Sequence, residues 1–128
     1  MLKGILAIND ILNDYSKEIQ ESITEKAIEV AKNGVNTLKQ TSPKAKKNTS
    51  QRGRYARGWR VKTTKGKGFV NCIIHNATDY QLTHLLEREH ATANGGKYVP
   101  KKPHIQPVND MCVSDFKNGV EEIIRNGG

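Results

Sequence analysis

Apolar residues recur at spacings of three and four over the first third of the chain, and this periodicity constrains the fold more than any other feature. Such spacing places side chains on one stripe of an α-helix. The pattern predicts one helix over about residues 10–40, with Asn9 or Asp10 as its N-cap and Ser42-Pro43 as its end. Residues 2–8 either join this helix or form a separate strand or arm. The stripe comprises Ile8, Leu12, Tyr15, Ile19, Ile23, Ala27, Val30, Gly34 and Leu38.

The length of this helix makes a prediction about packing. A helix of about 30 residues is roughly 45 Å long, whereas a compact domain of this chain's size has a diameter of about 36 Å. The helix therefore either kinks, with Gly34 as the weak point, or leaves part of its stripe for another subunit. We favour the second alternative. The candidate subunit-interface residues are Ile8, Leu12, Tyr15, Ile19 and Ile23.

The remainder of the chain contains strands and shorter helices. Residues 43–58 hold few apolar residues and many turn formers, which predicts a long basic loop. Alternating residues around Lys-Gly-Lys-Gly predict a hairpin at 59–75, with strands 59–64 and 69–75. A short helix is expected at 78–89, opened by the capping-box spacing of Thr78 and Gln81. Three prolines restrict residues 97–107 to an extended edge segment, and Pro107 suits the first turn of a last helix at 108–125.

These elements define an α+β fold, with a small antiparallel sheet that carries helices. The 128 residues and the 35% hydrophobic content fit one domain, residues 1–128. We expect a soluble protein made in the cytosol, because no run approaches the roughly 20 apolar residues of a membrane span and no signal peptide is evident. Cys72 and Cys112 are interpreted as small buried thiols.

The net charge of +8 is concentrated in one block. No acidic residue lies between Glu29 and Asp79, while the stretch from Lys32 to Lys67 holds 12 of the 21 lysines and arginines. Such a block attracts a polyanion, either nucleic acid or an acidic protein surface, unless it is a solvated loop that only keeps the protein soluble. The candidate contacts to DNA or to a partner are Lys44, Lys46, Lys47, Arg52, Arg54 and Arg57.

No residue pattern in the sequence predicts catalysis, a metal site or a cofactor. His84 and His90 are six residues apart and so point to different sides of a helix, and no HExxH or HxxEH pattern is present. Lys-Gly-Lys-Gly fits a hairpin turn better than a phosphate loop. Trp59 and Tyr80 are interpreted as core residues, with Tyr55 covering Trp59. The chain is therefore not expected to be an enzyme.

Three segments, in order, resemble the head-to-tail joining family of siphophages, whose members are often described as tail-completion or neck proteins. The first is Thr41-Ser42-Pro43 followed by Gly53-Arg54-Tyr55-Ala56-Arg57-Gly58-Trp59. The second is Tyr80-Gln81-Leu82-Thr83-His84-Leu85-Leu86-Glu87 with His90-Ala91. The third is Asn94-Gly95-Gly96 with Pro103-His104-Ile105-Gln106-Pro107. The motif positions to which the resemblance gives a structural role are Pro43, Gly53, Tyr55, Trp59, Tyr80, Leu85, Leu86, Glu87, His90, Pro103, His104 and Pro107.

The resemblance implies a structural virion protein at the head-tail junction, assembled in the host cytoplasm. Its partners would be copies of itself and neighbouring neck proteins such as a head-closure connector and a tail terminator. A ring of six copies is favoured over a ring of twelve. Non-specific DNA contact is expected at the channel, and no membrane is involved. This sequence departs from the family pattern in having Glu89 in place of a glycine, Arg52 in place of a threonine, and an insertion at 46–51. The alternative function is a small basic nucleic-acid-binding module.

Overall fold

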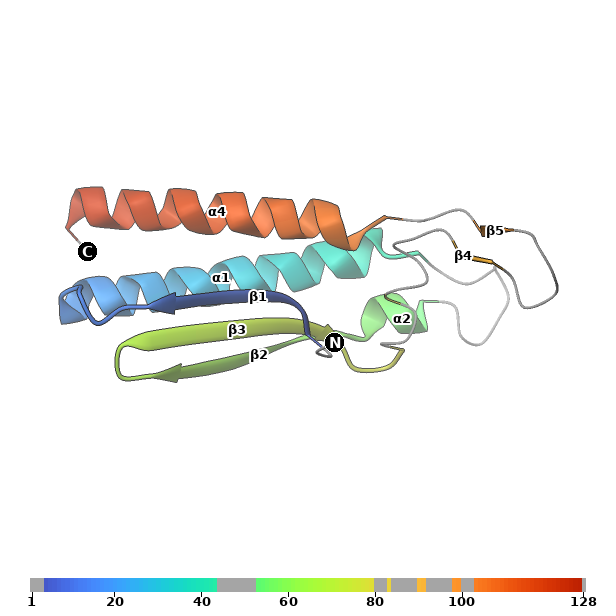
Figure 1. Cartoon of the computed structure of the whole chain (residues 1–128), viewed down its shortest axis with the longest axis horizontal. Helices are drawn as coiled ribbons and strands as arrows, with labels where there is room; N and C mark the ends of the chain where they lie inside the picture. The colour runs from blue at the N-terminus through green and yellow to red at the C-terminus, as the bar shows by residue number, and fades with distance from the viewer. Residues whose placement is uncertain are drawn as a thin grey trace.

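The computed structural model describes residues 4–43, 53–79, 83, 90–91, 98–99 and 103–127. In order, the elements are β1 (Gly4–Ile11), α1 (Lys17–Thr41), α2 (Arg54–Arg57), β2 (Trp59–Gly66), β3 (Phe69–Asn76), β4 (His90–Ala91), β5 (Tyr98–Val99) and α4 (Ile105–Asn126). The two long helices lie side by side along the length of the molecule (Figure 1). The sheet packs against α1 through β2 and β3, and its strand β1 also contacts α4. The α+β fold class is thus confirmed.

The main sheet is antiparallel with the order β1-β3-β2. The predicted hairpin forms, with β2 ending two residues later and β3 one residue later than predicted, and a two-residue turn at Lys67 and Gly68 joins them. Central strand β3 alternates, with Val70, Cys72 and Ile74 buried against α1. Its second neighbour is β1, in which Ile8 pairs with Cys72. The extended segment after residue 97 does contain a strand, β5, but β5 pairs with β4 in a separate two-stranded sheet.

The first helix is shorter than the sequence predicts. It begins at Lys17, and its N-cap is Ser16, whose side chain accepts a hydrogen bond from the Ile19 amide. The N-cap prediction at Asn9 or Asp10 was therefore wrong. Asn13, Asp14 and Ser16 favour a turn before this cap, which leaves residues 4–11 free to pair along the edge of β3. Ile8 and Leu12 consequently belong to β1 and the following turn, and not to a helical stripe.

Most of the predicted apolar stripe is covered within the chain, although its first residues are not in α1. Leu12 and Ile23 are 1% and 0% exposed, and Ile8 is also buried. The prediction that this stripe exceeds what one chain can bury was therefore wrong at these three positions, because β1, the hairpin and α4 together cover the apolar face of α1. Tyr15 and Ile19 are partly buried, and their contact with another subunit stays a prediction.

Gly34 lies where α1, α4 and β3 pack closely together. Helix α1 is continuous through Gly34, so the alternative of a kinked helix is not needed. A Cβ atom at this position would lie 2.8 Å from Cys112 Sγ of α4 and 3.0 Å from Ile74 Cδ1 of β3. Glycine therefore allows the sheet and α4 to meet across α1. The last helix begins at Ile105, three residues earlier than predicted, and Pro107 lies in its first turn as expected.

Candidate functional site

Three aromatic rings from distant segments meet at one end of the core. Tyr55 of α2 and Trp59 at the start of β2 have ring centroids 5.5 Å apart, and His104, directly before α4, lies 5.5 Å from Tyr55 and 6.3 Å from Trp59. All three contacts are edge-on, an arrangement that aromatic rings favour. The three residues are buried. We call this cluster, with Ser42, the aromatic junction.

Hydrogen bonds between side chains hold the aromatic junction together. The Trp59 indole Nε1 donates to Ser42 Oγ at the end of α1, at 2.8 Å. The Tyr55 hydroxyl and His104 Nε2 lie 2.8 Å apart, with the proton placed according to the histidine tautomer. Buried polar groups are costly unless they are bonded in this way, so these two bonds fix how four segments meet. The junction is a structural joint built of satisfied groups.

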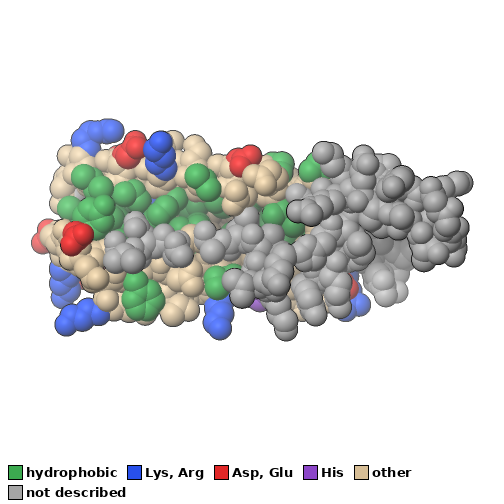
Figure 2. Space-filling view, in the orientation of Figure 1, with side chains coloured by type: hydrophobic (Ala, Val, Ile, Leu, Met, Phe, Trp, Pro, Cys, Tyr) green, Lys and Arg blue, Asp and Glu red, His purple; other side chains and the backbone are tan. Residues whose placement is uncertain are grey.

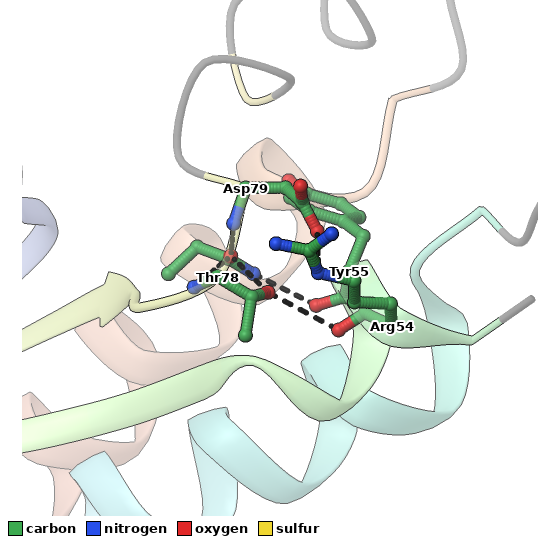
Figure 3. A network of polar contacts seen from close by, with 5 residues as sticks. Arg54, Tyr55, Thr78 and Asp79 are labelled. Atoms are coloured by element: carbon green, nitrogen blue, oxygen red, sulfur yellow. Dashed lines mark hydrogen bonds and ion pairs between the residues drawn. The ribbon is translucent and has the colours of Figure 1, made fainter. Parts of the chain in front are cut away.

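A second polar network supports the junction from the end of β3 (Figure 3). The buried side chain of Asn76 donates through Nδ2 to the Tyr55 carbonyl at 2.8 Å. Its Oδ1 accepts from the Asp79 amide at 2.8 Å and from the Thr78 amide at 3.2 Å. The Thr78 hydroxyl lies 3.2 Å from the Arg54 carbonyl. Asn76 therefore ties the chain that leaves the sheet to α2.

Sequence reasoning missed Asn76 and the helix it supports. Asn76 occupies an inward position of β3 at which Val70, Cys72 and Ile74 predict an apolar residue, and this break in the alternation is the signal for a buried polar role. Residues Arg54–Arg57 form the helical turn α2, so the prediction that residues 43–58 form no element was wrong there. The predicted helix at 78–89 does not include Thr78 or Asp79, which lie outside any helix, while Thr83 is helical.

Gly58 shows how closely this network packs. A Cβ atom there would clash with the Thr78 hydroxyl and lie 2.9 Å from Asn76 Oδ1. Only glycine fits without displacing the network. Gly53, which begins α2, has a φ of +78°, which is the left-handed region that glycine adopts most easily.

The predicted basic contacts are only partly within the described residues. Lys44, Lys46, Lys47 and Arg52 lie outside them. Arg54 and Arg57 are exposed on α2, and Arg54 Nε forms an ion pair with Asp79 Oδ2 at 3.3 Å. Because this pair is half exposed, it stabilises the fold by at most about 1 kcal/mol. Exposed cations also continue along the hairpin, where the sequence analysis had not assigned contacts: Arg60, Lys62, Lys65 and Lys67.

The remaining motif positions are divided between described and undescribed residues. Tyr80, Leu85, Leu86 and Glu87 lie outside the described residues. His90 belongs to strand β4. Pro43 directly follows the buried Ser42, and Pro103 is exposed beside the buried His104.

Within the described residues, no group of three or more histidine, cysteine or acidic side chains could hold a metal ion. An open cleft of about 760 Å³ lies between α1 and the β2–β3 turn. It is lined by charges of both signs, Lys17, Glu21, Glu25, Lys65 and Lys67. No helix in the described ranges is long and apolar enough to cross a membrane.

Both cysteines are buried free thiols, as the sequence predicts. Burial raises the pKa of the Cys72 thiol above its ordinary value, against a smaller lowering by the Thr63 hydroxyl. Burial also raises the pKa of Cys112, with a further contribution from the charge of Asp115. Both groups therefore stay protonated at neutral pH and are poor nucleophiles.

Comparison of this chain with protein-family models, with curated proteins and with solved structures finds no match. The likeness to the siphophage neck family therefore depends on the motif residues alone.

Proposed function

We propose that this protein is a structural subunit of a phage neck, a ring-forming tail-completion or head-to-tail connector protein. One observation carries the proposal: motif residues that are far apart in the sequence contact one another in the aromatic junction. The junction combines Ser42, Tyr55 and Trp59 of the first motif segment with His104 of the third. Two hydrogen bonds join them, one between Trp59 and Ser42 and one between Tyr55 and His104. Residues that hold a fold together in this way are the ones that a structural family needs to keep in common.

In this proposal the chain acts by shape and charge, without catalysis or a cofactor. Its neighbours would be further copies of itself, a head-closure connector on one side and a tail terminator on the other. The exposed cations of α2 and the hairpin would face an acidic neighbour or the DNA in the channel. These roles follow from the family resemblance, and the charge distribution is compatible with them.

Localisation in intact particles tests the proposal. In a phage that encodes this chain, we expect a tagged copy to be imaged at the head-tail junction, and an early nonsense mutation to yield filled heads and complete tails that remain unjoined. A host with a matching nonsense suppressor, which restores the full-length chain, should restore joined particles. Location inside the capsid or at the distal tail tip would refute the proposal.

The second candidate, a nucleic-acid-binding module, is favoured by the charge of residues 53–76, which include six lysines and arginines and no acidic residue. Such a module should hold DNA at near-physiological salt, with an affinity that falls steeply as salt rises. A neck subunit should bind DNA only weakly and without sequence preference. Titration of duplex and single-stranded DNA at several salt concentrations separates the two functions.

A further inference from the structure

The face of the hairpin that is turned away from α1 carries positive charge without negative charge. Trp59 is fully buried on the inner face, so the alternation of β2 directs Arg60 and Lys62 to the opposite one, where both are exposed. Helix α2 adds Arg57, because the Arg60 guanidinium donates to the Arg57 carbonyl at 2.6 Å. No acidic residue occurs between Arg54 and Asn76. We call this surface the outer hairpin face: Arg60, Lys62, Thr64, Phe69, Asn71, Ile73 and His75.

One aromatic ring lies open on the outer hairpin face. Phe69 is 40% exposed and pairs with Gly66 across the hairpin. A Cβ atom on Gly66 would clash with the Phe69 ring, so the ring lies over the glycine backbone. A ring in this position covers the glycine with one side and leaves its other side open, which agrees with its exposure. Tyr55 and Trp59 are interleaved with the same cations in the sequence, but both are buried and cannot stack on a ligand.

The cations and the ring are spread along the hairpin. Arg60 pairs with His75 and Lys62 pairs with Ile73, whereas Phe69 lies four to six residues further along β3. At about 3.3 Å per residue, the ring is roughly 13 to 20 Å from the two cations. Figure 2 shows Lys and Arg side chains along the edge of the molecule at which Figure 1 places the hairpin, with hydrophobic side chains between them. A ligand that meets all of these groups is extended, carries several negative charges and offers a flat ring.

Single-stranded nucleic acid meets all three requirements. Its backbone supplies a phosphate at each nucleotide, and its unpaired bases stack on aromatic side chains. A duplex keeps its bases stacked inside, and an acidic protein surface matches the cations without using the ring. We propose that the outer hairpin face binds single-stranded nucleic acid, with phosphates at Arg57, Arg60 and Lys62 and a base stacked on Phe69. This inference goes beyond the proposed function and does not rest on it.

The number of cations sets the strength of this binding. Each phosphate contact to a single strand contributes about −0.7 to the slope of log affinity against log salt, so three contacts give a slope of about −2. The affinity should then fall roughly fiftyfold between about 20 mM and about 150 mM salt. Binding is therefore measured at low salt. In this respect the outer hairpin face differs from the nucleic-acid-binding module of the second candidate function, which holds DNA at near-physiological salt.

Fluorescence anisotropy with a labelled oligothymidylate of about 16 nucleotides tests the charge contacts on the full-length protein. Wild type should bind this probe at about 20 mM salt, and more tightly than a duplex of the same length. Lys62→Gln should weaken binding and make the salt slope shallower by about 0.7, the value of one phosphate contact. Lys65→Gln is the matched control, because Lys65 lies on the same strand but lines the cleft beside α1. Its loss of the same charge should leave the slope unchanged.

A second pair of variants tests the ring. Phe69→Leu should weaken binding of the oligothymidylate about tenfold, because it keeps an apolar side chain and removes the stacking surface. Phe69→Tyr keeps the ring and should bind as wild type does. Circular dichroism checks that both variants fold, and the Lys62→Gln result stands independently of them.

Any of four results would overturn the inference: no binding of the oligothymidylate by wild type at about 20 mM salt, a duplex bound as tightly as the single strand, equal salt slopes for Lys62→Gln and Lys65→Gln, or equal affinities for Phe69→Leu and Phe69→Tyr. Polyglutamate that displaces the probe as well as unlabelled oligothymidylate of equal charge would also overturn it and would indicate an acidic protein partner. The particle imaging described above is independent of these measurements, because a subunit at the head-tail junction can lack this binding and a protein located elsewhere can have it. The two proposals therefore fail separately.

Discussion

Gly34 offers a direct test of how the layers pack, because two opposing energies act on its replacement by alanine. In a helix interior, replacing glycine by alanine raises the free energy of unfolding by up to about 1 kcal/mol, because glycine loses more backbone entropy on folding. Here the new Cβ atom would lie 2.8 Å from Cys112 Sγ and 3.0 Å from Ile74 Cδ1, both of them buried. Overpacking of this kind costs about 1–3 kcal/mol.

The steric cost should exceed the gain in helix propensity, so we expect Gly34→Ala to lower the free energy of unfolding by about 1–2 kcal/mol. For a domain of this size, that corresponds to a fall in Tm of roughly 3–8 °C. Urea unfolding followed by circular dichroism measures the first quantity and calorimetry the second. A double variant with Cys112→Ala should recover at least about 1 kcal/mol of the loss, because removal of Sγ makes room for the new methyl group.

Gly119 provides the matched control. It lies within α4, and a Cβ atom there would meet Cγ, Cδ and Cε of Lys26, a flexible side chain that is one-third exposed and can move aside. Gly119→Ala should therefore leave the free energy of unfolding unchanged or raise it by up to about 1 kcal/mol, and Tm should follow in the same direction. If Gly34→Ala is as harmless as Gly119→Ala, then the sheet and α4 do not meet across α1 and the packing argument fails.

Four further outcomes are expected. Tyr55→Phe should cost about 1–2 kcal/mol by urea unfolding, because it removes the bond to His104 and leaves the ring contacts in place; a neutral result would mean that this bond contributes nothing. Asn76→Ala should cost about 2 kcal/mol or more, since its single side chain bonds to the backbone of both α2 and the strand exit. Cys72 and Cys112 should react with a thiol reagent only after unfolding, and fast labelling of the native protein would contradict their burial. Both thiols have folded pKa values above the ordinary 9.0, so their stabilising effect is complete below about pH 9 and is lost as pH rises further. The unfolding free energy should therefore fall as pH rises above about 9, and fall less when both are replaced by alanine.

The hairpin and α4 were predictable because their signals are local. Alternation from Trp59 and from Phe69 around a glycine turn predicts both strands, and the periodicity after Pro107 predicts the helix. The strand β1 was not predictable from the same rules, because Ile8, Leu12 and Tyr15 fit a helical spacing equally well. What selects the strand is pairing with β3, about 60 to 70 residues away, and no local pattern reports such pairing.

The aromatic junction was predictable in its members but not in its contacts. The resemblance gave structural roles to Tyr55, Trp59 and His104, and the core position of Trp59 was expected. That Tyr55 bonds to His104, 49 residues later, is a property of the folded chain. The sequence indicates the role of Asn76 only through the polar residue at an inward strand position. That feature predicts a buried polar side chain but not its hydrogen-bond partner.

The comparison of α1 with α4 shows which property of a helix leaves apolar surface exposed. Helix α1 carries a broad apolar face, and its seven buried residues are covered inside the chain by the sheet and α4, while Ile19 and Ile28 are partly buried. Helix α4 packs mainly on α1, yet its apolar residues extend from Cys112 round to Val113 and Ile124, which remain exposed. Apolar width in excess of what the neighbouring layers cover, more than helix length, is therefore the feature that distinguishes a helix with apolar surface left exposed.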